Sequence, residues 1–112
     1  MSRLENFQDG MEEAAEFCAV HTAAAHRAHA VLAERQDMGP ALADYTAALS
    51  ELLSVVVAAQ RLFAELTIGR ITIVNFAASA GALDAYRTRS MRKVEAAERN
   101  LRILYLVPRG TA

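Results

Sequence analysis

The 112-residue chain carries a net charge of −1 and is 54% hydrophobic, a balance that excludes strongly basic and intrinsically disordered classes. Alanine supplies 24 of the hydrophobic residues, so much of the apolar surface consists of small side chains that let helices approach closely. Ala, Leu, Glu and Arg favour helices, and the only two prolines are Pro40 and Pro108. We therefore predict an all-α fold.

The chain also carries signals about its compartment. Its single cysteine, Cys18, cannot form an intramolecular disulfide, and the first residues lack the features of a signal peptide. The longest uncharged apolar run, residues 71–83, is shorter than the roughly 20 residues that span a bilayer. We expect a cytoplasmic protein without a membrane span.

Apolar residues at three-four spacing predict a first long helix near the start of the chain. Capping boxes at Ser2 with Glu5 and at Asp9 with Glu12 give two possible starts, and continuity of the apolar stripe favours the earlier one. The stripe consists of Leu4, Phe7, Met11, Ala14, Cys18, His21, Ala25, Ala28 and Leu32.

A turn at residues 37–40 precedes the second helix, which we expect to begin at Pro40 and to end before Gly69. Apolar residues cover most of this helix, which predicts that it is central and the most buried. Residues 71–74 are β-branched and suit a strand as well as a helix, although a lone strand has no partner and a helix is favoured. The stripe of the third helix fails at Arg87 and Ser90, so we expect this helix to be bent or exposed there.

Three helices of about 30 residues, each near 45 Å long, predict an elongated antiparallel bundle formed by residues 1–107 as one domain. Residues 108–112 would form a tail, and the run from Leu106 to Gly110 matches a thrombin linker, so this end is either native or derived from an expression vector. Because two neighbours cannot cover the second helix, we expect a homodimer. The residues predicted to mediate self-association are Leu49, Leu53 and Val57.

Two groups of polar residues raise the question of metal binding. Cys18 and His21 lie three residues apart and could supply half of a zinc site across a dimer axis, although their place on the apolar stripe favours a structural role. Glu12, Glu13 and Glu16 lack the Glu-x-x-His pattern of iron-binding bundles, and a solvated face is the better interpretation. His26 and His29 are expected to be exposed. We predict no catalytic site, no metal and no cofactor, and hence a protein that is not an enzyme.

Basic residues accumulate in the third helix: residues 57–112 carry nine basic and four acidic side chains, whereas residues 1–56 carry three and nine. The pairs Glu95 with Arg99 and Glu98 with Arg102 have favourable i, i+4 spacing. The remaining cations are expected to face the acidic first helix of this or a neighbouring chain, a partner protein, or nucleic acid. The predicted partner-binding residues are Arg87, Arg89, Met91, Arg92, Lys93, Leu101, Leu104 and Tyr105.

The order of helices, and above all the last one, from Val94 to Leu104 running into Leu106-Val107-Pro108, resembles the small helical antiactivators of LuxR-type quorum-sensing receptors. The resemblance implies a cytoplasmic dimer that binds a transcription activator and blocks it, and it assigns no functional residue. It favours a non-enzymatic regulatory protein that inhibits another protein. A nucleic-acid-binding protein that uses the arginine-rich third helix and a purely structural oligomer are the alternatives.

Overall fold

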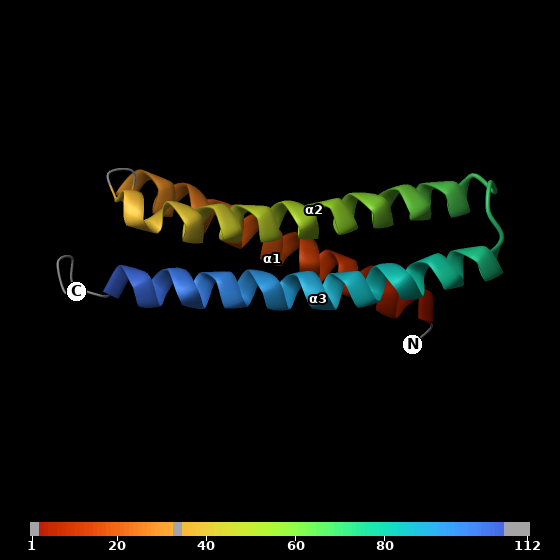
Figure 1. The fold of residues 1–112 in the computed structure, drawn as a ribbon. Coiled ribbons are helices and arrows are strands. Elements are labelled where there is room, and N and C mark those ends of the chain that lie inside the picture. The colour runs from red at the N-terminus through yellow and green to blue at the C-terminus, as the bar shows by residue number, and fades with distance from the viewer. Residues whose placement is uncertain (1–2, 33–34, 107–112) are drawn as a thin grey trace.

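A computed structural model describes residues 3–32 and 35–106 of the chain, which form three long α-helices (Figure 1). The helices are α1 (Arg3–Leu32), α2 (Gly39–Thr67) and α3 (Ile73–Leu106), and a short 3-10 segment, η1 (Gln36–Met38), precedes α2. The molecule is a rod of 59 × 19 × 19 Å. The predicted all-α, elongated antiparallel bundle is confirmed, whereas the expected tail at residues 108–112 lies outside the described residues.

The three helices do not contribute equally to the bundle. Helices α2 and α3 run antiparallel side by side as a hairpin, and α1 crosses obliquely behind them (Figure 1). The connection between α1 and α2 and the carboxyl end of α3 lie at one end of the rod, and the α2–α3 connection lies at the other. Helix α1 therefore covers one broad face of the hairpin and leaves the opposite face uncovered.

The helix boundaries follow local signals in the sequence. Helix α1 begins at Arg3, in agreement with the earlier of the two predicted starts. Helix α2 begins at Gly39 with Pro40 in its first turn, where a missing N–H costs no hydrogen bond. Met38, the residue before α2, is fully buried in the core and so holds this connection against the bundle.

Helix α2 ends at Thr67, before Gly69 as predicted, and Gly69 has a φ angle of +77°. The Gly69 N–H donates to the carbonyl of Leu66 at 3.1 Å, and the Arg70 N–H donates to the carbonyl of Glu65 at 2.9 Å. This pair of bonds is the Schellman motif, which satisfies carbonyls that the end of a helix leaves unpaired. Because the left-handed conformation disfavours a side chain, glycine suits this position.

The β-branched run at residues 71–74 forms no strand, and only its second half is helical. Ile71 and Thr72 precede α3, which begins at Ile73. The Thr72 Oγ1 accepts a hydrogen bond from the backbone N–H of Asn75 at 3.2 Å, and so caps the new helix. The preference for helix over strand is therefore correct for Ile73 and Val74, and the first two residues belong to the turn.

The core consists of two clusters along the rod. The larger one gathers around Tyr45, Leu52 and Val94, which are almost completely buried. The second lies toward the α2–α3 connection, where the ring centroid of Phe7 lies 5.3 Å from that of Phe63 and 5.7 Å from that of Phe76. Aromatic contacts at these distances favour the packing of α1 against both helices of the hairpin.

The structure of α3 differs from the expectation for Arg87 and Ser90. The stripe of α3 was predicted to be exposed or bent at Arg87 and Ser90, yet only 1% of Ser90 and 18% of the Arg87 side chain are accessible, within one continuous helix. The Ser90 Oγ is buried without a hydrogen-bond partner among the described residues. The Arg87 guanidinium lies against α1 at Gly10, where an added Cβ would be 3.3 Å from its Nε. Two polar residues therefore occupy core-facing positions.

Two adjacent leucines of α2 give a matched test of this packing. Leu52 is completely buried, whereas 52% of Leu53 is exposed. Leu52→Ala should lower the free energy of unfolding by about 2–5 kcal/mol because it leaves a cavity in the core. Leu53→Ala makes the same change in helix propensity on the same helix, and should lower the free energy of unfolding by less than about 1 kcal/mol. Urea unfolding measures both, and equal losses would contradict the assignment of faces.

Candidate interaction surface

The residues considered for metal binding are distributed over different environments. Among residues 3–32 and 35–106, no group of three or more His, Cys, Asp or Glu side chains is placed to hold a metal ion. Cys18 is buried and its thiol donates to the Leu49 carbonyl at 3.9 Å, while burial raises the pKa of the thiol. Glu12, Glu13 and Glu16 are exposed on α1. Cys18 therefore behaves as a small core residue, and the three glutamates form a solvated face.

His21 lies in a buried polar contact that joins all three helices. Its Nδ1 is 2.6 Å from the hydroxyl of Tyr45 on α2 and 3.1 Å from Oε2 of Glu98 on α3. The Tyr45 hydroxyl lies 3.3 Å from the backbone carbonyl of His21, to which it donates. The Nδ1 of His21 therefore lies within hydrogen-bond distance of one oxygen on each of the other two helices. The contact occupies His21 with partners from its own chain, so it fits a structural role.

The remaining histidines lie at the surface of the α1–α2 side. His26 and His29 are exposed, as expected, and line a small hollow with Thr46 and Ser50. The Nε2 of His29 is 3.5 Å from the Thr46 Oγ1, which is a long contact. These side chains therefore form a polar margin of that hollow.

The basic residues predicted to form one surface on α3 do not all remain available, because some of them pair with carboxylates of the same chain. Arg87 Nε donates to Oδ1 of Asp84 at 3.0 Å, and Lys93 Nζ lies 3.2 Å from Oε2 of Glu51 on α2. Arg87, one of the cations expected to face another helix, a partner protein or nucleic acid, therefore pairs within its own helix instead. Lys93 faces α2 of its own chain and not the acidic first helix. Of the two predicted i, i+4 pairs, only Glu98 with Arg102 forms within the described residues, at 3.4 Å.

The apolar members of the same predicted surface lie mostly inward. Leu101 is buried in the larger core cluster, and Met91 and Leu104 pack against that cluster. The Tyr105 side chain lies outside the described residues. Placing Leu101 on a partner-facing surface was therefore wrong, because its position coincides with the core face of α3. Leu101 in the core and the partly buried Met91 and Leu104 therefore do not share one exposed surface with the arginines.

Three arginines keep an outward position on α3. Arg89, Arg92 and Arg99 are exposed and have no carboxylate partner among the described residues. The guanidinium carbon of Arg89 lies 5.3 Å from the ring centroid of Tyr86, a cation–π contact. Since Arg87, Lys93 and Arg102 are paired within the chain, half of the six basic residues are already neutralised. This arrangement reduces the phosphate contacts available to a nucleic-acid ligand.

The residues predicted for self-association differ in their exposure to solvent. Leu49 is buried in the core of the single chain, so its side chain is not available to a second copy. Leu53 and Val57 remain 52% and 38% exposed on the uncovered side of α2. The sequence correctly indicated an incompletely covered α2, but it did not resolve which leucine faces outward.

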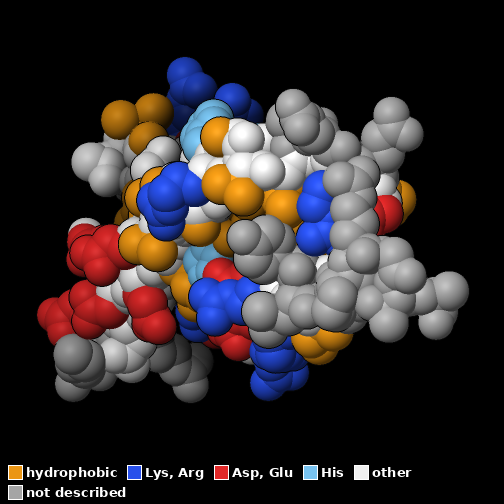
Figure 2. Space-filling model, turned by 90° about the vertical axis from the view of Figure 1, so that its left-hand side faces the viewer, with side chains coloured by type: hydrophobic (Ala, Val, Ile, Leu, Met, Phe, Trp, Pro, Cys, Tyr) orange, Lys and Arg blue, Asp and Glu red, His pale blue; other side chains and the backbone are white. Residues whose placement is uncertain are grey.

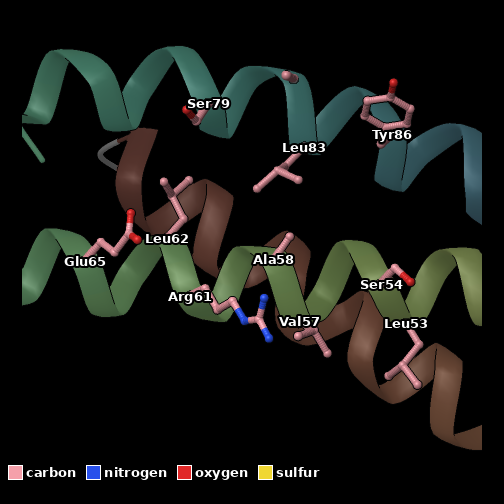
Figure 3. Close-up of a pocket in the computed structure, with 11 residues that line it drawn as sticks. Leu53, Ser54, Val57, Ala58, Arg61, Leu62, Glu65, Ser79, Leu83 and Tyr86 are labelled. Carbon is pink, nitrogen blue, oxygen red and sulfur yellow. The ribbon is translucent and has the colours of Figure 1, made fainter.

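A groove between α2 and α3 is one of the hollows of the described surface (Figure 3). It has a volume of about 690 Å³ and lies on the face of the hairpin opposite α1, which passes behind both helices in Figure 3. Leu62 and Leu83 point into the space between the helices. Its lining consists of Leu53, Ser54, Val57, Ala58, Arg61, Leu62, Glu65, Ser79, Ala82, Leu83 and Tyr86.

Small and apolar residues make up most of the lining of this groove. Small residues, among them Ser54 and Ala58 on α2 and Ala82 on α3, line it and allow close approach of another backbone. On its two sides stand Val57 and Tyr86, of which 38% and 50% are exposed. A helix can pack against such a surface by inserting its own side chains between the ridges of α2 and α3. Leu83 continues the apolar spacing of Phe76 and Ala80, which indicates a core residue and not a groove residue, and no sequence signal distinguishes Tyr86.

One further property belongs to α2 as a whole. Within the described residues, α2 is the one helix that is long and apolar enough to cross a membrane by length and composition, and 33% of its most apolar 18-residue stretch is buried in the bundle. Nine residues of α2 are buried against α1 and α3, which accounts for much of its apolar character.

Comparisons with known proteins add no family to this description. No family model, no curated protein and no solved structure matches the chain. The groove and its surroundings must therefore be interpreted from their own chemistry.

The buried contact of Tyr45 generates a testable expectation. Tyr45→Phe removes the hydroxyl that contacts the Nδ1 and the carbonyl of His21, and should lower the free energy of unfolding by about 1–2 kcal/mol at pH 8. Tyr86→Phe is the matched control, because Tyr86 is half exposed and no hydrogen bond to its hydroxyl is found among the described residues. Urea unfolding of the three proteins measures the difference.

The buried Tyr45 hydroxyl also predicts how the free energy of unfolding depends on pH. Burial, with a further contribution from the Glu98 carboxylate, raises the pKa of Tyr45 above its ordinary value of 10.0. The unfolded chain then releases this proton at lower pH than the folded chain, so the free energy of unfolding falls as pH rises above about 10. Tyr45→Phe should lose this part of the alkaline decline, and Tyr86→Phe should retain it. Parallel declines in the wild type and Tyr45→Phe would contradict the assignment.

Proposed function

We propose that this protein is a non-enzymatic regulatory protein that binds another protein and prevents that partner from assembling. The groove between α2 and α3 would hold a helix of the partner. The resemblance to LuxR-type antiactivators makes a transcription activator the first partner to test, and the cytoplasm the compartment. We also propose that the protein acts as a homodimer.

The observation that carries this proposal is the uncovered face of the α2–α3 hairpin. Leu53, Val57 and Tyr86 stay substantially exposed along it and line one groove. Exposed apolar patches with polar rims commonly mark surfaces that bind proteins. A groove lined by small residues between two parallel ridges fits an amphipathic helix, whose apolar side chains would recur at three-four spacing.

The groove also offers polar groups that orient a ligand. Arg61 and Glu65 lie one turn apart on α2 at its margin, and neither forms an ion pair among the described residues. A partner helix with charges of the opposite sign at the same spacing would satisfy both groups. Tyr86, held by the Arg89 guanidinium, supplies an aromatic contact of the kind that is enriched at binding hot spots.

Affinity capture from the native organism tests the proposal with two matched variants. Val57→Glu places a charge in the groove, whereas Gln60→Glu places the same charge on an exposed position of α2 that does not line it. Wild type and Gln60→Glu should capture the same stoichiometric protein. Val57→Glu should bind it at least about tenfold more weakly, because a charge buried without a partner is costly.

The captured partner is then purified and its affinity measured by titration against each variant. Circular dichroism must show that Val57→Glu keeps its helical content. A stoichiometric partner that binds Val57→Glu as tightly as the wild type would exclude the groove as its site. The absence of any stoichiometric partner would reject the regulatory role itself.

A further inference from the structure

A further hollow of the described surface lies between the start of α1 and the first half of α3. Its volume of about 670 Å³ is within the range of roughly 300–1,000 Å³ that is usual for small-molecule sites. The end of the rod that Figure 2 shows, beside the α1–α2 connection, carries acidic, basic and apolar side chains together. The hollow lies toward the other end and is mostly apolar, with a lining that includes Leu4 and Phe7 of α1 and Ile73, Phe76, Ala77 and Ala80 of α3. We call it the α1–α3 pocket.

The apolar part of the α1–α3 pocket combines buried rings with exposed aliphatic side chains. Phe7 and Phe76 are buried, whereas 62% of Ile73 and 36% of Leu4 remain exposed. An apolar ligand in the pocket would remove these aliphatic side chains from water, which is favourable in proportion to the apolar area covered. The pocket therefore suits a ligand with an apolar body.

Gly81 lines the same pocket and widens it. A Cβ added at Gly81 would meet no heavy atom within 4 Å beyond its chain neighbours and the backbone of its own helix. Glycine inside a helix lowers stability relative to alanine, so the chain gives up stability at a position where a side chain would fit. A ligand that uses this space accounts for glycine at a position that packing within the chain leaves open.

An ion pair forms the polar end of the α1–α3 pocket. The Nε of Arg87 donates to Oδ1 of Asp84 at 3.0 Å, and the Arg87 guanidinium lies against α1 at Gly10. Within residues 3–32 and 35–106, neither Nη2 of Arg87 nor Oδ2 of Asp84 has a hydrogen-bond partner. The polar end therefore presents one donor and one acceptor that the described part of the chain does not use.

These two groups select the head group of the ligand. The pair of Asp84 and Arg87 carries no net charge, so an anionic head group would meet the Asp84 carboxylate and a cationic one would meet the Arg87 guanidinium. A carboxamide is uncharged and carries both a carbonyl acceptor and N–H donors. Its carbonyl can accept from Nη2 of Arg87 while its N–H donates to Oδ2 of Asp84. An amide head group thus complements both charged residues.

We propose that the α1–α3 pocket binds a small apolar carboxamide, with its hydrocarbon part against Phe7 and Phe76 and its amide at Asp84 and Arg87. The pocket shares no lining residue with the α2–α3 groove and lies on a different face of α3. The inference therefore goes beyond the proposed function. Because the lining comes from α1 and α3, the ligand stabilises the docking of α1 on the hairpin.

Three probes with the same alkyl chain and different head groups test the proposal: octanamide, octanoate and octylamine. Binding is followed by the shifts of backbone amide signals in NMR titrations. Octanamide should bind with a dissociation constant of about 1 mM or tighter, as expected for a ligand of its size. Octanoate and protonated octylamine should bind at least about tenfold more weakly. Failure of octanamide to bind, or equal binding of a charged probe, would overturn the proposal.

Gly81→Leu fills the pocket, and Ala78→Leu is its matched control at an exposed position of α3 that lines neither the pocket nor the groove. Gly81→Leu should weaken the binding of octanamide at least about tenfold. It should unfold at the same or a higher urea concentration than the wild type, since leucine favours a helix more than glycine does. Ala78→Leu should bind octanamide like the wild type. Equal affinity of the two variants would exclude the pocket as the site.

Asp84→Asn tests the assignment of the head group. The substitution removes the carboxylate that pairs with Arg87, so the guanidinium becomes available to an anion. The affinity for octanoate relative to octanamide should rise at least about tenfold over the wild-type ratio, in a protein whose circular dichroism is unchanged. An unchanged ratio would overturn the proposal. Failure of this site is distinct from failure of the proposed function, since none of these variants alters a residue that lines the α2–α3 groove.

Discussion

The structure depends on a geometric constraint: one helix can cover only one side of a two-helix hairpin. Helices α2 and α3 bury much of their apolar surface against each other, and α1 crosses behind them (Figure 1). Because α2 carries apolar residues around most of its circumference, Leu53 and Val57 remain exposed although Leu52, the neighbour of Leu53 in the chain, is fully buried. The groove thus follows from the number of helices, and any function that uses it relies on a face that the fold cannot close from within the same chain.

The oblique position of α1 needs a specific contact, because alanine-rich surfaces pack in more than one register. The contact of His21 with Tyr45 and Glu98 supplies it by joining one residue from each helix at a single level of the rod. A shift of α1 by one turn would leave buried polar groups without partners, at a cost of about 1–3 kcal/mol for each group. Polar burial therefore determines the register of α1 against the hairpin.

Local sequence signals were sufficient to predict the helices. The exposed faces, in contrast, depend on packing between residues that lie far apart in the sequence. Pro40 and Gly69 mark helix ends through their own backbone preferences, which neighbouring helices do not alter. The burial of Ser90 and Arg87 was harder to predict. A polar side chain fits a core-facing position only where the neighbouring helix leaves room for it, as Gly10 does for Arg87. The groove could not be located from periodicity, because the spacing that marks an apolar face does not say which neighbour covers it.

The short connection between α2 and α3 has a consequence for how the chain folds. Only residues 68–72 separate the two helices, so their pairing closes a small loop and costs little chain entropy. Helix α1 joins through contacts between residues far apart in sequence, such as Phe7 with Phe76. We expect the hairpin to form first and α1 to dock last. Substitutions in the buried side of α1 should then act on the unfolding rate more than on the folding rate, because contacts made late in folding are the first to be lost.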